Sequence, residues 1–264
     1  MLARGVVLAL ALMLAGVPAW AQEPPQWSPA WSGRNGLLTG YAFHFGIETL
    51  SGDDARYQWD FDLGGEVDVL RIGPGRVNLA VNFEGVLGEI LQRFDPIFNN
   101  YTIDTLGGAT THGVELAAVF HHVSRHLGDR SKPFGIAWNM LGVHARWQGR
   151  PGGVDVQARG WAQATVNAYF VDYSGEVGSD VLAERVFNDK VSLVARATIN
   201  ALFIDGSKSD RGTQTGGRIE GGVRFSGAGA AVEFYVAADR RVDADPFEQR
   251  PETWALVGVR LVNR

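Results

Sequence analysis

The chain has 264 residues, a formal net charge of −5 at pH 7 and no cysteine. The absence of cysteine excludes a disulfide-rich secreted fold. The mild acidity, with no basic block or stripe, argues against a nucleic-acid partner.

The N-terminal segment has the pattern of a secretory signal. Arg4 supplies a positive start, residues 6–17 form an apolar run, and residues 19–21 read Ala-Trp-Ala, with small residues where a signal peptidase cleaves. The apolar run is shorter than the roughly 20 residues that a membrane-spanning helix needs. We therefore predict a signal peptide at residues 1–21. Residues 22–35, rich in proline and tryptophan, are expected to form a periplasmic N-terminal arm.

From residue 36 onward, apolar and polar residues alternate. The first such segment places Tyr57, Trp59, Phe61 and Leu63 on one parity and acidic or amide residues on the other. Similar alternation occurs at 77–84, 154–159, 218–225 and 232–236. A period of two indicates strands with one apolar and one polar face.

Apolar and polar residues also alternate in the strands of soluble β-sandwiches. The length of the segments and the charges on their polar faces favour a membrane barrel. The segments reach the roughly 9–11 residues that a tilted spanning strand needs, and their polar faces carry charges of both signs. We predict an all-β fold for residues 36–264, a transmembrane antiparallel up-and-down β-barrel of about 12 strands. A soluble periplasmic β-protein is the weaker alternative.

Turn signals support an up-and-down order. Short turns are expected at 73–75, 150–153 and 227–229, and longer polar connections at 51–54, 91–100, 128–133, 206–215 and 241–251. Barrels of the outer membrane have short periplasmic turns and longer outer loops. The predicted location is therefore the outer membrane of a Gram-negative cell. The stretch 169–188 does not divide clearly into strands and turns.

Three polar residues are predicted on the lipid-facing side of one hairpin. His122 and Ser124 share the parity of Leu116 and Phe120, so they should face outward. A hairpin symmetric about the loop at 128–133 pairs His122 with Asn139, and directly opposed residues point to the same side with Cβ atoms about 4.5–5.5 Å apart. The loop is on the outer side, because the next turn, at 150–153, is short.

This arrangement matches the chemistry of a catalytic triad. A polar group that faces lipid loses hydrogen bonds to water, at a cost of about 1–3 kcal/mol unless a neighbour replaces them. Ser124 could donate to one nitrogen of His122, and the other nitrogen could donate to Asn139, as nucleophile, base and orienting group. A structural cluster without catalysis is the alternative. His121 points the opposite way, so His121, His122 and His126 do not share one metal.

The run His122-Val123-Ser124 followed by Trp138-Asn139 resembles the active site of the bacterial outer-membrane phospholipase A family, a twelve-stranded barrel. The lipid A deacylase barrels are similar in their His-x-Ser. The resemblance implies Ser124 as nucleophile, His122 as general base, Asn139 as orienting residue and membrane lipids as substrates. The longer run from His122 to Gly128-Asp129 also looks like a motif of uncharacterised exported bacterial proteins.

The resemblance also implies calcium as a cofactor, and it raises a homodimer as an alternative to a monomer. The calcium ligands of the phospholipase family do not map onto this chain. Asp129 is the one candidate carboxylate near the hairpin, although a loop aspartate is more often a turn residue. The chain departs from the family by having Arg125-His126 directly after its serine, and a longer loop before Asn139.

The preferred prediction is an outer-membrane serine hydrolase that cleaves acyl esters of membrane lipids, either phospholipid or lipid A. The alternative is a non-catalytic outer-membrane barrel, a channel or a structural protein, in which the His/Ser/Asn cluster is only interfacial.

Overall fold

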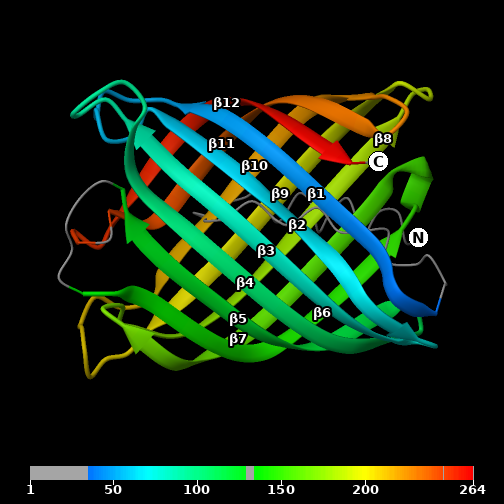
Figure 1. Cartoon of the computed structure of the whole chain (residues 1–264), viewed down its shortest axis with the longest axis horizontal. Helices are drawn as coiled ribbons and strands as arrows, with labels where there is room; N and C mark the ends of the chain where they lie inside the picture. Colours follow the sequence, from blue (N-terminus) through cyan, green and yellow to red (C-terminus); the bar gives the residue numbers. More distant parts are fainter. Residues whose placement is uncertain (1–34, 129–133, 246, 264) are drawn as a thin grey trace.

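The computed structural model describes residues 35–128, 134–245 and 247–263, which form a closed antiparallel barrel (Figure 1). Its strands are β1 (Gly36–Leu50), β2 (Trp59–Ile72), β3 (Gly75–Gly88), β4 (Asp95–Thr111), β5 (Val114–Leu127), β6 (Ile136–Gly149), β7 (Asp155–Tyr169), β8 (Tyr173–Val186), β9 (Val191–Ile204), β10 (Gln214–Ser226), β11 (Ala230–Asp245) and β12 (Arg250–Asn263). One short 3-10 turn, Pro151–Gly153, precedes β7. None of the described residues belongs to a helix long and apolar enough to cross a membrane.

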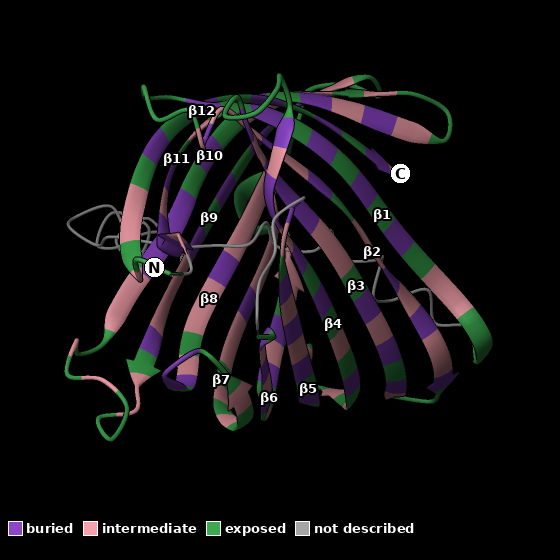
Figure 2. Ribbon diagram, turned by 60° about the vertical axis from the view of Figure 1, so that its left-hand side comes forward, coloured by how far each residue is buried: buried purple, intermediate pink, exposed green. Residues whose placement is uncertain are grey.

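The predicted all-β barrel of twelve strands is confirmed. Each strand pairs with its sequence neighbours, and β1 pairs with β12 to close the sheet. Closure leaves no open edge, so the backbone hydrogen bonds are satisfied within the sheet, as a hydrocarbon environment demands. Burial alternates along the strands, which shows as alternating bands in Figure 2. On β5, for example, Leu116 and Phe120 are exposed on the outside whereas Glu115 and Arg125 are buried inside.

The connections also follow the up-and-down order. The turns at 73–74, 112–113, 150–154, 187–190 and 227–229 lie at one end, together with the start of β1 and the end of β12. The connections at the other end include the longer loops at 51–58, 89–94 and 205–213. By the rule for outer-membrane barrels, the end with the short turns is periplasmic and the other end is the outer rim.

Several segments that look like loops in the sequence are strands. β4 begins at Asp95 inside the predicted 91–100 connection, and β11 continues to Asp245 inside the predicted 241–251 connection. The polar residues of these segments are satisfied across the lumen: Asp243, at a left-handed φ of 48°, accepts hydrogen bonds from Arg211 and Tyr173. The stretch 169–188 resolves into a three-residue connection and β8.

The predicted orientation of Tyr57 is wrong, and the predicted N-terminal segments lie almost entirely outside the described residues. Tyr57, expected on the lipid-facing side, instead precedes β2 and is buried inside the barrel against Trp254, with ring centroids 5.2 Å apart. The β1–β2 connection is longer than predicted, so Tyr57 belongs to this loop and the alternation of β2 does not determine where its side chain points. The predicted signal at 1–21 and arm at 22–35 lie outside the described residues except for Asn35, whose side-chain oxygen accepts a hydrogen bond from the Gly73 N–H.

The lumen contains paired charges and three apolar clusters, the smallest of which consists of Leu106, Ala117 and Val119. Between β9, β10, β11 and β12, buried arginines and glutamates form a continuous network; Arg260, for example, contacts Glu220 and Glu233 at 2.8 and 2.9 Å. Toward the outer rim, one apolar cluster gathers around Trp138 and another around Phe98. The bulge of β11 contributes Val242 to the cluster around Trp138 and Ala244 to the cluster around Phe98.

Candidate active site

The β5–β6 hairpin positions His122 opposite Asn139, as the sequence predicts. Both side chains are on the outward parity and are half-buried by their neighbours. The His122 Nδ1 atom lies 2.7 Å from the Asn139 Oδ1 atom, so the ring N–H donates to the amide oxygen. This bond fixes the orientation of the ring and leaves Nε2 as the nitrogen available to accept a proton.

Ser124 also faces outward, but its hydrogen bond differs from the prediction. Among the described residues, the hydroxyl bonds to His126, with Oγ 3.1 Å from Nε2, and not to His122. Alternate residues of a strand share a face, so Ser124 lies between two histidines on one surface. The His122 ring is directed across the hairpin toward Asn139, which leaves His126 as the partner of the hydroxyl.

Tyr101 holds the second histidine in place. It is directly opposite Ser124 in the β4–β5 register, and its ring meets the His126 ring edge-on with centroids 5.2 Å apart. Phe83 packs against the other side of Tyr101 at 4.8 Å. The polar cluster is therefore bordered by outward-facing aromatic side chains near the outer end of β5.

The sequence alone did not single out His126 and Tyr101 as members of this site. His126 could have been included, because it has the same parity as Ser124 and lies two residues away. Tyr101 required the pairing of β4 with β5, which depends on a tight turn at 112–113 that was not predicted. That turn contains His112 and Gly113, both with positive φ.

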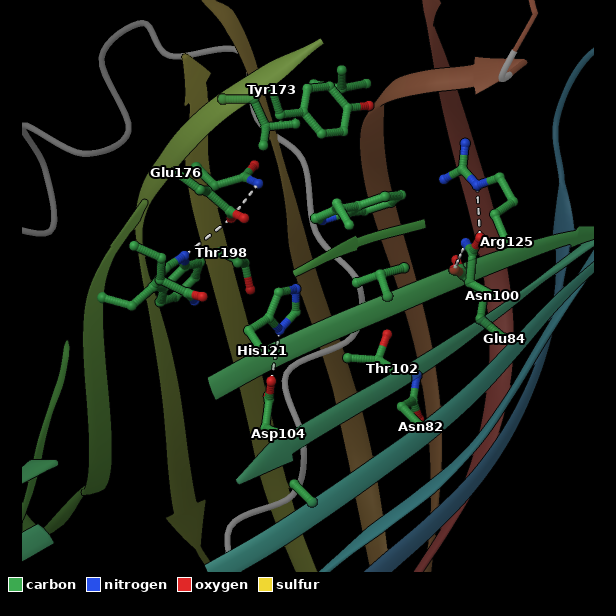
Figure 3. Close-up of a pocket in the computed structure, with 18 of the residues that line it drawn as sticks. Asn82, Glu84, Asn100, Thr102, Asp104, His121, Arg125, Tyr173, Glu176 and Thr198 are labelled. Carbon is green, nitrogen blue, oxygen red and sulfur yellow. Dashed lines mark hydrogen bonds and ion pairs between the residues drawn. The ribbon is translucent and has the colours of Figure 1, made fainter. Parts of the chain in front are cut away.

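The inward side of the same part of the barrel is held by hydrogen bonds, as Figure 3 shows for His121 with Asp104 and for Arg125 with Asn100. His121 bonds to Asp104 with Nδ1 2.6 Å from the carboxylate oxygen, and Arg125 donates to the Asn100 side chain at 2.7 Å. Arg125 also donates to the backbone carbonyl of Asp243 at 2.8 Å. These contacts confirm that His121 points away from His122 and Ser124.

The described residues around Ser124 do not fit a calcium site. Calcium prefers carboxylate and carbonyl oxygens, usually six to eight of them. The described outward side chains next to the serine are those of Tyr101 and Ala137 on the neighbouring strands and of His122 and His126 on its own strand, and no group of three or more His, Cys, Asp or Glu in the described chain could hold a metal ion. Asp129, the predicted candidate ligand, lies outside the described residues.

No family model and no curated protein sequence matches this chain. Solved structures do resemble it. The outer membrane phospholipase A from Escherichia coli has a TM-score of 0.50 and 12% identity, covering 85% of this chain and 96% of that one. The Salmonella typhi outer membrane phospholipase, a dimer with bound calcium, has a TM-score of 0.50 and 11% identity, covering 85% and 90%. LpxR from Salmonella typhimurium has a TM-score of 0.48 and 8% identity, covering 84% and 99%.

At these identities the likeness establishes the fold alone. The chain has the fold of outer-membrane β-barrels. The closed sheet and its apolar exterior fit the Gram-negative outer membrane.

Proposed function

We propose that the chain is an outer-membrane serine hydrolase that cleaves acyl esters of membrane lipids, either phospholipid or lipid A. Ser124 is the nucleophile, His122 the general base and Asn139 the residue that orients His122. The observation that carries this proposal is the 2.7 Å hydrogen bond between His122 and Asn139 on the outward face, two residues from an outward-facing serine. A histidine that is oriented through one nitrogen presents the other to a nucleophile.

The reaction follows from these groups. The Ser124 Oγ attacks the acyl carbonyl while its proton passes to His122 Nε2, and His122 then gives that proton to the alcohol that leaves when the ester C–O bond breaks. Water attacks the acyl-enzyme while His122 accepts its proton; the bond between the acyl carbon and Ser124 Oγ then breaks, His122 returns the proton to Oγ, and the fatty acid departs. The Asn139 oxygen stabilises the charged imidazole through the Nδ1–H bond.

His126 has a separate role in the resting site. It gives the Ser124 hydroxyl a hydrogen-bond partner at 3.1 Å, which offsets the cost of placing a hydroxyl at a lipid-facing surface. Rotation about the Cα–Cβ bond of Ser124, between staggered positions, moves the hydroxyl from His126 toward His122.

The position of the cluster supports a lipid substrate. Ser124, His122 and Asn139 face the surroundings of the barrel and not its lumen, near the outer rim. An ester that reaches them from the side must belong to a molecule in the outer leaflet. The exposed aromatic rings of Tyr101 and Phe120 lie on the same outer surface, where they would contact acyl chains.

The test uses the purified full chain in detergent micelles with phospholipid or lipid A, each with and without calcium. Released fatty acid is measured. Ser124→Ala should abolish hydrolysis while the barrel keeps its folded electrophoretic mobility. Thr105→Ala is the matched control, because it removes an exposed outward hydroxyl from β4, opposite Phe120, and should leave the rate unchanged. Equal fatty acid release by the wild type and Ser124→Ala would refute the proposal.

We also propose that the active form is a homodimer. The support is that a phospholipase of the same fold is a dimer. Sedimentation velocity of the active protein in micelles, with and without calcium, tests this point. A monomer under conditions of full activity would contradict it.

A further inference from the structure

A second candidate site lies inside the barrel. A cavity of about 150 Å³ is lined by residues of β3 to β9 and β11 on the lumen side (Figure 3). Since a water molecule occupies about 30 Å³, the cavity has room for about five waters or for one small organic molecule. Trp138, Trp161 and Tyr173 supply aromatic walls, and the remaining lining is mainly amide, hydroxyl and charged groups.

Apart from the guanidinium nitrogens of Arg241, three buried polar atoms in this lining have no hydrogen-bond partner among the described residues. They are Nδ1 of His144, Oε1 of Gln163 and Oδ1 of Asn200. His144 is only 4% exposed. More than nine in ten buried polar groups in proteins are hydrogen-bonded, so three such atoms around one cavity indicate that its contents supply the missing bonds. Two of the three are amide oxygens, which accept hydrogen bonds and cannot donate them.

Glu176 adds a carboxylate that forms no salt bridge in the described chain, although it interacts electrostatically with His121. Its Oε1 accepts hydrogen bonds from the Trp161 indole N–H at 3.0 Å and from the Asn200 amide at 2.8 Å, both neutral donors. Figure 3 shows the Glu176 side chain at the cavity wall, with its hydrogen bonds drawn. The other carboxylates at this cavity differ, since Asp104 contacts His121 and Glu84 contacts Arg241.

Several carboxylates gather around one guanidinium group beside the cavity. Arg241 is shared by three of them, with distances of 2.6 Å to Asp60, 2.9 Å to Glu84 and 3.1 Å to Asp239. The cavity therefore combines unused acceptors, a carboxylate bonded only to neutral donors, and aromatic rings, in a lining of three carboxylates (Glu84, Asp104, Glu176) and three guanidinium groups (Arg125, Arg159, Arg241). Such surroundings favour a cation that carries N–H donors, because the ring faces also attract positive charge.

We propose that this cavity binds a small protonated amine. Glu176 is its charge partner, and the side-chain oxygens of Gln163 and Asn200 accept its N–H groups. This site is separate from the outward-facing serine cluster, and the inference does not depend on the proposed hydrolysis.

The experiment is isothermal titration calorimetry of the full chain, folded in micelles at neutral pH, with ethanolammonium chloride. Ethylene glycol, glycolate and potassium chloride serve as neutral, anionic and inorganic counterparts. Glu176→Gln removes the charge with little change in shape, and Gln163→Leu removes one acceptor. Glu184→Gln is the matched control, because Glu184 is on the same strand but bonds to Ser192 and Arg224, away from the cavity.

The expected result is saturable binding of ethanolammonium, absent for the other three solutes. Glu176→Gln should weaken it at least about tenfold and Gln163→Leu several-fold, while Glu184→Gln should leave it unchanged. A cavity that holds only water would give no saturable heat with the amine and would overturn the proposal. Equal binding of ethylene glycol or potassium, or full affinity in folded Glu176→Gln, would overturn it as well.

Discussion

The charged network inside the barrel predicts a large and specific effect of Glu233→Leu on stability. Glu233 is fully buried and accepts hydrogen bonds from Arg196 at 2.8 and 3.0 Å, from Arg224 at 2.7 Å and from Arg260 at 2.9 Å. The network balances four carboxylates against four guanidinium groups. Its members are Glu48, Glu184, Glu220, Glu233, Arg196, Arg218, Arg224 and Arg260.

Removing one carboxylate leaves buried guanidinium groups in excess. Breaking a buried ion pair in this way costs about 3–5 kcal/mol, whereas replacing both partners by apolar side chains is often nearly neutral. Glu233→Leu should therefore lower the free energy of unfolding by about 3–5 kcal/mol, and adding Arg196→Met should restore most of that loss.

Denaturant unfolding of the barrel folded into lipid vesicles, followed by tryptophan fluorescence, measures these differences. Glu248→Gln is the control, because Glu248 forms exposed pairs with Arg56 and Arg250 at the outer rim and should change stability by only about 0–1 kcal/mol. A loss of under about 1 kcal/mol for Glu233→Leu, or a double variant as unstable as the sum of both single changes, would refute the reasoning.

Three further predictions concern the site, the lumen and the outer rim. His122→Ala should lower the turnover rate by about 10²–10⁴-fold, as loss of a general base does, and His126→Ala by less than about tenfold; equal losses in the fatty acid assay would contradict the assigned roles. Because charged and apolar clusters fill the lumen, barrels in planar bilayers should show no steady ion conductance, and stable open-channel steps would support the channel alternative. At the rim, burial raises the pKa of Asp172, but the hydrogen bonds and charge of Arg211 outweigh burial and lower it. This carboxylate therefore stabilises the fold above its usual pKa of 3.8 and loses that contribution as pH falls through the lowered value, so Asp172→Asn should reduce the acid dependence of the unfolding midpoint.

The local rules of strand geometry were enough to predict much of the site. A period of two separates the lumen and lipid faces, and a symmetric hairpin sets the pairing of His122 with Asn139. Both predictions need only neighbouring strands. Which of the two histidines bonds to the Ser124 hydroxyl was not predictable, because both lie on the same face of the strand and the answer depends on the rotation of the serine side chain.

Features that depend on distant parts of the chain were also beyond the sequence. The bulge of β11 is stabilised by Arg211 and Arg125, which approach Asp243 from the β9–β10 loop and from β5. The polar residues around Asp243 are typical of a loop when only the local sequence is considered. The arginines that donate hydrogen bonds to Asp243 are 32 and 118 residues away in the chain. The cavity has the same origin, because its lining comes from eight strands.

The contact between the first and last strands has a consequence for how the barrel is assembled. β1 and β12 pair over only seven positions, from His44 with Val262 to Leu50 with Leu256, whereas β4 and β5 pair over fourteen. The Asn263 side chain extends this short seam by accepting from the Phe43 N–H at 2.7 Å and donating to the Tyr41 carbonyl at 3.2 Å. Joining groups 220 residues apart carries the largest loop-closure entropy in the sheet. We therefore expect the hairpins to insert first and β1 to pair with β12 last. The hydrogen bonds of the Asn263 amide would then be among the last to form.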